Sequence, residues 1–393
     1  MRVLTINCGS STLKFGLFES EGERFLVRGA VDRIGGSGGN VEIYSERGEK
    51  TVRPASAGDH IWAALLVMRQ LDRCGLLDGV GAVGHRIVHG GARFSGPALL
   101  DPAALKGIEA LGKLAPLHNR PALAAIRAVR EALGPEIPQV AAFDTAFHRT
   151  MPHVARLFAL PRRFADEGVV RYGFHGLSYE YVVGELRRLD PEAAAGRVVI
   201  AHLGNGASMA AVREGVGVDT TMGFTPSGGL VMGTRPGDLD PGVILHLLRS
   251  MDPGALRELV NRESGLLGVS GTSADMRDLL ERVAEDPRAA EAVALFCYAA
   301  KKSLGSLAAA LGGLDTLVFT GGIGEHASAV RWRICEGLEF LGIRLDPERN
   351  AQNAPVVSRD GEPVAVHVIP ADEDLTIARH TYKLARFTSQ EGA

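Results

Sequence analysis

A cluster of small polar residues near the start of the sequence has the composition of a phosphate-binding turn. Within eight residues there are an amide, a glycine, three hydroxyl groups and an ammonium group: Asn7, Gly9, Ser10, Ser11, Thr12 and Lys14. Backbone N–H groups, hydroxyls and an ammonium group can bind phosphate oxygens, and an amide oxygen can contact hydrated Mg²⁺. An ordinary polar turn between two strands uses the same residue types, so this segment alone leaves both interpretations open.

A second candidate site lies at residues 84–91, where Arg86 and the histidines His85 and His89 precede a pair of glycines. A guanidinium group can donate two parallel hydrogen bonds to a carboxylate or a phosphate, which would suit an acidic ligand. Arg86 could equally form a structural salt bridge, and the two histidines are expected to be structural.

Two generic nucleotide-binding patterns are present, and neither is convincing. Residues 107–113 match most of a P-loop, but Leu114 stands where a serine or threonine would hold magnesium, and the segment is predicted to be helical. Residues 322–327 fit a loose dinucleotide pattern, but Glu325 would place a negative charge beside a pyrophosphate. We therefore expect neither a P-loop nor a dinucleotide-binding domain.

Two strand-turn-strand patterns would position the polar turns. Apolar residues alternate over residues 3–7 and 13–18 on either side of the first turn, and a similar pattern spans residues 197–213 around a turn at 204–208. One hairpin opens each half of the chain, which suggests a duplicated fold whose halves offer backbone N–H groups to one ligand.

Helical and strand patterns alternate in the rest of the chain, which is typical of an α/β protein. Pro121 is expected to begin its helix, and the glycine pair at 321–322 is expected to form a loop. The predicted helices span residues 59–74, 101–114, 121–133 and 287–311, and the predicted strands include residues 83–88, 139–144 and 316–320.

Length and composition favour a globular protein of two domains. The 393 residues exceed the roughly 150 of a typical domain. The net charge of −3 is spread along the chain without a basic cluster, so no nucleic-acid partner is expected. The four cysteines have neither zinc-site nor disulfide spacing, and no apolar run approaches the about 20 residues that span a membrane. We therefore expect a cytoplasmic protein without a membrane partner.

Seven motifs resemble those of the acetate kinases and occur in the same order. The resemblance runs from Val3 to about Arg379, essentially the whole chain, and several of the motifs are particular to that family. The motifs are NCGSSTLK at 7–14, GHRIVHGG at 84–91, APLHN at 115–119, FDTAFH at 143–148, YGFHG at 172–176, HLGNG at 202–206 and MGTRPGD at 232–238.

The resemblance implies the α/β fold of the superfamily that contains acetate and sugar kinases, heat-shock chaperones and actin. That fold has two duplicated ribonuclease H-like domains with an ATP cleft between them. The N-terminal domain would comprise residues 1–149, completed by the C-terminal segment 375–393, and residues 150–374 would form the second, nucleotide-binding domain. The two hairpins fit such a duplication independently. The family also implies a homodimer.

The resemblance further implies which residues bind the metal and ATP. Asn7 and Glu373 would bind Mg²⁺, with Mn²⁺ as an alternative ion, although Asp372 or Asp374 could take the place of Glu373. The residues expected to bind ATP are Lys14, the turn of His202, Leu203, Gly204, Asn205 and Gly206, and two nucleoside-binding segments, Asp275, Met276 and Arg277, and Gly322, Ile323, Gly324, Glu325 and His326.

The implied reaction is reversible, direct transfer of the ATP γ-phosphoryl group to acetate, which gives acetyl phosphate and ADP. Acetate is already ionised, so the reaction needs no strong base but does need positive donors around the phosphoryl oxygens. His175 and Arg235 would be these donors, and Asp144 would orient the reacting groups or a metal-bound water. The residues implied for the substrate are Arg86 for the carboxylate and Val88, Leu117, Phe174 and Pro226 for the methyl group.

Two other functions remain open at this point. One extra methylene changes binding by only about 1 to 3 kcal/mol, so the chain could instead be a propionate kinase. A non-catalytic ATP-binding switch of the same superfamily is the alternative from another class, but it would have no use for Arg86, Asp144, His175 and Arg235.

The chain also departs from the usual pattern of the family it resembles. Tyr179 stands where a histidine is common, and His326 stands in place of an asparagine. Ser227-Gly228 replaces Leu-Glu, and the segment Ala371-Asp372-Glu373-Asp374 replaces Thr-Asn-Glu-Glu. These changes affect the base contacts and the detail of the pocket rather than the reaction.

Overall fold

The computed structural model describes residues 1–9, 11–19, 24–113 and 116–391, and within these ranges it leaves out the side chains of residues 113, 116–118 and 387–391. The chain folds as two compact units. Unit 1 comprises Met1–Ala146 and Asp372–Ala393, and unit 2 comprises Phe147–Ala371. The domain divisions after residues 149 and 374 remain predictions.

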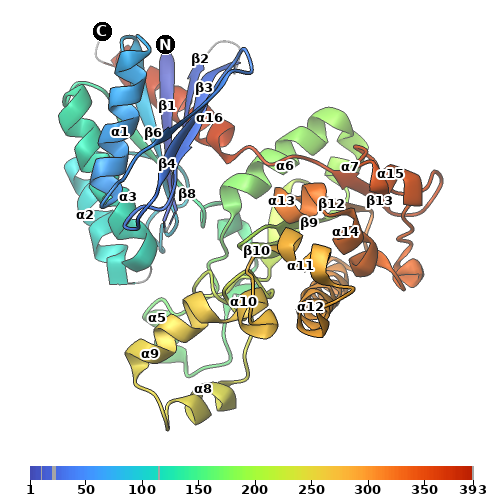
Figure 1. Ribbon diagram of the computed structural model, residues 1–393. Helices are drawn as coiled ribbons and strands as arrows, with labels where there is room; N and C mark the ends of the chain where they lie inside the picture. Colours follow the sequence, from blue (N-terminus) through green and yellow to red (C-terminus); the bar gives the residue numbers. More distant parts are fainter. Residues whose placement is uncertain (10, 20–23, 114–115, 392–393) are drawn as a thin grey trace. The chain divides into compact units, whose positions relative to one another are not determined.

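Unit 1 is built on a mixed sheet (Figure 1). Its strands are β1 (Arg2–Cys8), β2 (Leu13–Glu19), β3 (Arg24–Val31), β4 (Asn40–Ser45), β5 (Lys50–Pro54), β6 (Val80–Ile87), β7 (Ala98–Leu99) and β8 (Gln139–Phe143). They lie in the order β5-β4-β3-β2-β1-β6-β8-β7. Strands β1 to β5 form an antiparallel meander, whereas β1, β6 and β8 are parallel.

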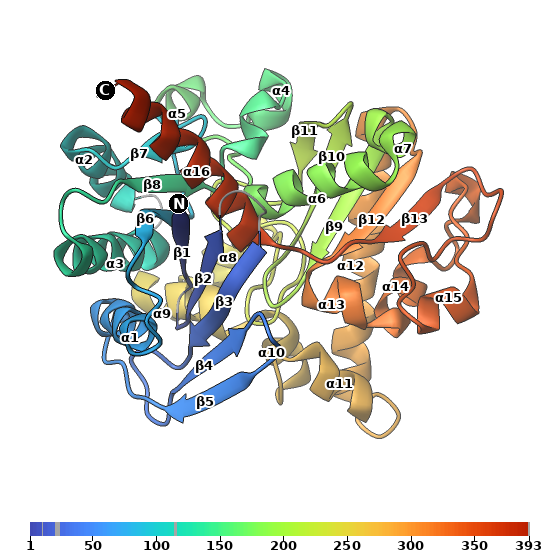
Figure 2. The same ribbon diagram turned by 90° about the horizontal axis from the view of Figure 1, so that it is seen from above.

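Helices pack against the sheet of unit 1, and β1 is buried on both faces. Helices α1 (His60–Arg73) and α3 (Pro116–Leu133) contact β2 and β1, and α16 (Glu373–Glu391) contacts β1, β2, β6 and β8 (Figure 2). Leu4 and Ile6 belong to the main core, while Val3 and Phe18 pack against Ala378 of α16. Burial on both faces explains why β1 carries apolar side chains on both, with Leu4 and Ile6 on one face and Val3 on the other.

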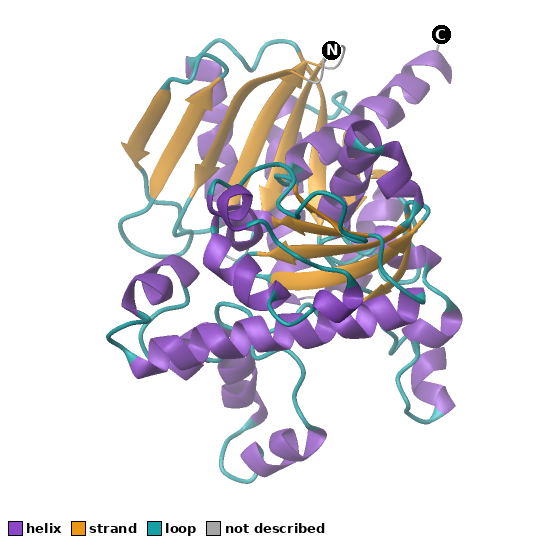
Figure 3. Cartoon of the chain, turned by 90° about the vertical axis from the view of Figure 1, so that its right-hand side faces the viewer, coloured by secondary structure: helices purple, strands orange, loops and turns teal. Residues whose placement is uncertain are grey.

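Unit 2 is built on a smaller mixed sheet, in the order β11-β10-β9-β12-β13. Its strands are β9 (Arg197–Leu203), β10 (Ala207–Arg213), β11 (Val216–Thr220), β12 (Thr316–Thr320) and β13 (Ala365–Val368). Helices α6 (Gly176–Leu189) and α7 (Pro191–Ala195) contact β9, and the long helix α12 (Pro287–Leu311) contacts β9, β10 and β11. Figure 3 shows the strands as continuous twisted layers with helices against them.

The remaining helices are short. They are α2 (Pro102–Ala110), α4 (His153–Arg156), α5 (Arg162–Asp166), α8 (Pro241–Leu247), α9 (Pro253–Glu258), α10 (Gly265–Ser270), α11 (Met276–Arg282), α13 (Gly321–His326), α14 (Ser328–Cys335) and α15 (Pro347–Ala351). Within the described residues no helix is both long and apolar enough to cross a membrane.

The same strand topology occurs in both units. In unit 1 the strands β3-β2-β1 are antiparallel and β1-β6-β8 are parallel; in unit 2 β11-β10-β9 are antiparallel and β9-β12-β13 are parallel. The first hairpin of each unit, β1–β2 and β9–β10, occupies the same place in its sheet. The predicted α/β fold with a duplicated ribonuclease H-like topology is therefore confirmed.

Two local predictions were wrong. The helix expected to begin at Pro121 begins at Pro116 and continues through Pro121, so the helix tolerates a residue that cannot donate a backbone hydrogen bond. The loop expected at Gly321-Gly322 is instead the first turn of α13. Gly321 has a φ of 76° and packs against the backbone of Leu203, so glycine is needed there for a close approach rather than for a loop.

Candidate active site

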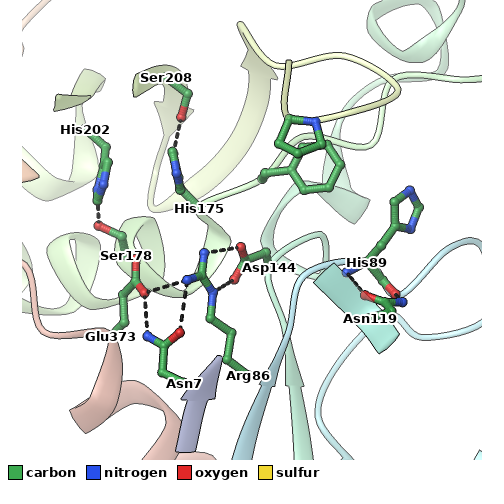
Figure 4. A network of polar contacts seen from close by, with 12 residues as sticks. Asn7, Arg86, His89, Asn119, Asp144, His175, Ser178, His202, Ser208 and Glu373 are labelled. Carbon is green, nitrogen blue, oxygen red and sulfur yellow. Dashed lines mark hydrogen bonds and ion pairs between the residues drawn. The ribbon is translucent and has the colours of Figure 1, made fainter. Parts of the chain in front are cut away.

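Three side chains of unit 1 meet where its parallel strands end. Asn7 is near the end of β1, Arg86 is near the end of β6, and Asp144 directly follows β8. Adjacent parallel strands bring their carboxyl ends to the same edge of a sheet, which is where ligands bind in open α/β sheets. Arg86 forks onto Asp144, with Nε to Oδ1 at 2.9 Å and Nη2 to Oδ2 at 2.6 Å, and its Nη1 donates to Asn7 Oδ1 at 3.1 Å (Figure 4).

The far end of the chain completes this network. Glu373, the first residue of α16, accepts a hydrogen bond from Asn7 Nδ2 at 3.2 Å and lies 3.5 Å from Arg86 Nη1 (Figure 4). Burial disfavours the charged form of Arg86, but Asp144 and then Glu373 outweigh it and raise the pKa of the guanidinium group. Arg86 is therefore a fixed positive charge at the edge of the sheet.

The hairpin places Lys14 directly opposite Asn7, a member of this network. It pairs with Asn7 across β1 and β2, and directly opposed residues of an antiparallel pair point to the same face. The prediction that this hairpin gathers an amide and an ammonium group is thus consistent with its register. Ser10, which belongs to the same turn, lies outside the described residues.

Asp374 adds a buried carboxyl group beside Glu373. Burial, reinforced by Asp372 and Glu373, raises the pKa of Asp374 to about 6, while Lys14 and Arg28 oppose the shift. Its Oδ1 atom is buried without a hydrogen-bond partner among the described residues. Such an oxygen can bind a ligand or a water molecule in place of a protein donor.

Asp372 anchors the start of α16. Its Oδ1 accepts a hydrogen bond from the backbone N–H of Leu375 at 3.0 Å, as an N-cap residue does. Its Oδ2 accepts from Arg28 Nη2 of β3 at 2.5 Å. The guanidinium group of Arg28 also lies 4.7 Å from the ring centroid of Phe25.

The oxygen atoms at this site fit Mg²⁺ as a partial ligand set. No group of three His, Cys, Asp or Glu side chains among the described residues is placed to hold a metal by itself. Mg²⁺ is usually held by only one or two carboxylates together with waters and phosphate oxygens. The carboxylate of Glu373, the amide of Asn7 and the unpartnered oxygen of Asp374 have the chemistry that this requires.

The side chains of Arg235 and His175 pack closely against the turn between β9 and β10 of unit 2. A side chain at Gly206 would meet Arg235 Nη2 at 2.8 Å and His175 Nε2 at 3.3 Å. Glycine at this position therefore lets the predicted catalytic residues His175 and Arg235 reach the turn. Arg235 is also held by Pro226, whose carbonyl oxygen accepts from Nη1 at 2.5 Å.

His175 and His202 form a stacked pair in unit 2, with ring centroids 4.3 Å apart. His175 Nδ1 lies 2.9 Å from Ser208 Oγ, and His202 Nδ1 lies 2.8 Å from Ser178 Oγ (Figure 4). His175 precedes α6 with a left-handed φ of 58°, which is uncommon for a residue with a side chain. Both imidazole rings are thus fixed in orientation.

The predicted substrate pocket residues are partly described. Val88 directly follows β6 in unit 1 and is buried, and Phe174 of unit 2 is buried as well. The Phe174 carbonyl oxygen accepts a hydrogen bond from His148 Nε2 at 2.9 Å, so His148 has a structural role. The side chain of Leu117 lies outside the described residues.

The two segments predicted to bind the nucleoside lie at helices α11 and α13 of unit 2. Asp275 caps α11 by accepting from the backbone N–H of Arg277 at 2.9 Å. The other segment, Gly322 to His326, lies within α13, whose last carbonyl groups Gly324 O and Glu325 O accept from the buried Arg331. Met276 is buried, while Arg277 and His326 are exposed.

Three residues that hold the predicted functional groups in place were not predicted from the sequence. Ser178, Ser208 and Arg28 each hold a predicted functional residue or the helix that carries it. Ser178 and Ser208 lie within or beside recognised motifs, so their position was a usable signal. Arg28 has no such signal, because its partner Asp372 lies 344 positions away in the chain.

The duplicated α/β topology, with a polar hairpin turn in each unit, defines a protein of the acetate and sugar kinase, heat-shock chaperone and actin class. The family model described as "Acetokinase family" matches residues 2–379. The chain is 47% identical to the acetate kinase of Rhodopseudomonas palustris, over 98% of each chain, and 43% identical to that of Clostridium botulinum, over 98% of this chain and 100% of the relative.

Solved structures give the same result. The acetate kinase of Porphyromonas gingivalis is 38% identical, with a TM-score of 0.89, over 98% of this chain and 99% of that one. A propionate kinase from Francisella tularensis is 35% identical, with a TM-score of 0.92, over 97% of this chain and 99% of that one. The chain belongs to the acetokinase family.

Proposed function

We propose that the protein transfers the γ-phosphoryl group of ATP to acetate, reversibly, to give acetyl phosphate and ADP. Membership of the acetokinase family supports this reaction, as do the curated relatives named acetate kinase. The observation that carries the proposal is the network of Arg86, Asp144, Asn7 and Glu373 at the edge of the parallel strands. A structural salt bridge alone would not need an amide and a second carboxylate.

Asn7 and Glu373 would hold Mg²⁺, and the bound ion would neutralise charge on the ATP phosphates. Asn7 donates from its Nδ2 to Glu373, which keeps the two oxygen-bearing groups adjacent. Asp144 fixes the Arg86 guanidinium group in one orientation, and the positive charge of Arg86 attracts the carboxylate of the acceptor. Lys14 and the turn from His202 to Gly206 would bind the ATP phosphates.

His175 and Arg235 would donate hydrogen bonds to the oxygens of the transferring phosphoryl group. Both lie against Gly206, where no side chain separates them from the backbone of the turn. Donors that are already oriented stabilise developing charge without reorganising, and this is usually a large part of catalysis. Because the acetate carboxylate is already ionised, Asp144 is assigned an orienting role rather than that of a base.

The acceptor pocket would be formed by Val88, Leu117, Phe174 and Pro226, and a second substrate is proposed alongside acetate. The similarity to a propionate kinase at 35% identity favours some activity on propionate. One methylene group changes binding by only about 1 to 3 kcal/mol, so a pocket for a methyl group discriminates weakly.

The remaining parts of the proposal rest on the family. Residues Asp275 to Arg277 and Gly322 to His326 would bind the nucleoside, and the protein would act in the cytoplasm as a homodimer. Two features support rigid nucleoside contacts: Asp275 caps the start of α11, and Arg331 donates a hydrogen bond to Gly324 O near the end of α13.

The reaction can be tested by trapping its product. The protein is mixed with Mg-ATP and acetate in the presence of hydroxylamine, which converts an acyl phosphate to a coloured hydroxamate. We expect hydroxamate only when both ATP and acetate are present. ATP binding without hydroxamate would instead indicate the non-catalytic switch and would contradict the proposal.

A further inference from the structure

Tyr179 is a buried residue of α6 in unit 2. Its side chain is fully buried, and its ring lies 5.6 Å from that of His148. The phenol oxygen is 2.5 Å from Ser208 Oγ, its one hydrogen-bond partner among the described residues. A buried hydroxyl with a single partner has a defined hydrogen-bond direction.

Ser208 connects Tyr179 to His175. The serine lies in β10, is itself buried, and places its Oγ atom 2.9 Å from His175 Nδ1. Tyr179, Ser208 and His175 thus form a continuous chain of hydrogen bonds within unit 2. A serine hydroxyl has one proton to donate and two lone pairs to accept.

The direction of the chain follows from the phenol. Burial raises the pKa of Tyr179 above its ordinary value, although the hydrogen bond to Ser208 opposes the shift, so the phenol keeps its proton. That proton needs an acceptor, and Ser208 Oγ is the one within reach. Ser208 then donates its own proton to His175 Nδ1. The reverse direction would leave the phenol proton buried without an acceptor.

A histidine that accepts at Nδ1 carries the proton of its neutral form on Nε2. His175 Nε2 is the atom that lies against Gly206, 3.3 Å from the place where a side chain would begin. We propose that Tyr179, acting through Ser208, is a positioning residue that fixes the Nε2-protonated tautomer of His175, so that a neutral imidazole presents its N–H at the β9–β10 turn.

This inference rests on the proposed function only for its consequence, which is that the N–H would donate to the phosphoryl group. The neighbours of His175 agree with a neutral ring. His202 is stacked on it at 4.3 Å, and Arg235 Nη2 shares the position beside Gly206. A second positive charge there would be repelled by that of Arg235.

Histidine imidazole ¹⁵N NMR of the full-length protein tests the inference without any substrate. The His175 signals are assigned by their loss in His175→Ala. We expect a protonated Nε2 and an unprotonated Nδ1 in the parent, and a mixture of tautomers in Tyr179→Phe, which keeps the ring and removes the hydroxyl. Tyr179→His restores a ring N–H that can donate to Ser208, so it should keep the parent pattern.

The kinetic test uses the same variants. Tyr179→Phe should lower kcat roughly three- to tenfold, the value of one hydrogen bond, with little change in KM. Tyr179→His should recover most of the loss. Ser208→Ala removes the hydroxyl group that links Tyr179 to His175. It should therefore lower kcat as much as Tyr179→Phe does. His202 serves as the internal control, because its Nδ1 contacts Ser178 and its tautomer should not change.

An unchanged His175 tautomer in both Tyr179→Phe and Ser208→Ala would overturn the inference. A changed tautomer with an unchanged kcat would support the inference but contradict its proposed consequence for phosphoryl transfer. If His175→Ala kept the parent kcat, the proposed role of His175 in transfer would be wrong, while the tautomer measurement would still decide the relation between Tyr179 and His175.

Discussion

At the scale of single residues, each unit holds some of its proposed functional groups in place before any ligand binds. Arg86 is held by the two hydrogen bonds that it donates to the Asp144 carboxylate, and His175 is held by Ser208. Such groups can stabilise a transition state without first being ordered. The residues that contribute most should therefore affect the rate of transfer more than the binding of substrate.

His175→Ala and Arg235→Ala test this directly. Each should lower kcat by about 100-fold or more and change the KM for acetate much less, because their interactions strengthen as charge develops on the phosphoryl oxygens. Steady-state kinetics with His246→Ala, an exposed histidine, as the matched control separates the two parameters. A raised KM with an intact kcat would show that the residue only binds the ground state.

The metal assignment is tested by Asn7→Ala and Glu373→Ala. Each removes one protein oxygen from the proposed ligand set, so the Mg²⁺ concentration at half-maximal activity should rise. Asp374→Asn is the companion variant, because Asp374 is the neighbouring carboxylate with an unpartnered oxygen. If only Asp374→Asn changed the magnesium titration, Asp374 would replace Glu373 as the ligand.

At the scale of elements, the start of α16 shows how the chain delivers Glu373 to the site. Asp372 caps the helix and also pairs with Arg28 of β3, so one side chain fixes both the first turn and its place on the sheet. An asparagine at this position would cap the helix equally well but could not form the ion pair.

Asp372→Asn and Asp372→Ala separate these two contributions. Asn keeps the cap and should lower the free energy of unfolding by less than about 1 kcal/mol, because the ion pair is partly exposed to solvent. Ala also loses the cap and should cost about 1 kcal/mol more. Urea denaturation measures both. Equal stability of the two variants would mean that the cap contributes nothing.

The elements differ in how well the sequence predicts them. The hairpins β1–β2 and β9–β10 were predicted because two strand-like segments around a small polar turn form a local pattern in the sequence. The passage of α3 through Pro121 was not, because packing of the helix outweighs the local preference of proline. Tyr179, Ser208 and His175 were likewise not connected, because a hydrogen bond between β10 and α6 depends on the fold rather than on spacing.

At the scale of the whole molecule, buried histidines link stability to pH. His85 of unit 1 donates Nε2–H to Gln139, and His148 of unit 2 donates Nε2–H to Phe174. Burial lowers the pKa of each to about 4 from an ordinary 6.5, although these hydrogen bonds oppose the shift. Both Nδ1 atoms are buried without a partner among the described residues, so a second proton would be poorly accommodated.

The free energy of unfolding should therefore decrease as the pH falls from about 6.5 toward 4. The unfolded chain binds these protons first, and each histidine contributes a slope of up to about 1.4 kcal/mol per pH unit in that window. Denaturation series with His85→Gln and His148→Gln should show shallower slopes than the parent, whereas the exposed His246→Gln should not. Parallel pH profiles for all four proteins would contradict the assignment.

The proposed acetate pocket is tested most directly by comparing kcat/KM for formate, acetate, propionate and butyrate, in the parent and in Val88→Ala. We expect acetate to be the best acceptor of the parent. The propionate-to-acetate ratio of kcat/KM should rise up to roughly tenfold in Val88→Ala, because the shorter side chain admits one methylene group, worth about 0.8 kcal/mol or somewhat more. A general loss of stability would lower kcat/KM for both acids alike. A parent that prefers propionate, or an unchanged ratio in a folded Val88→Ala variant, would contradict the proposed acetate pocket.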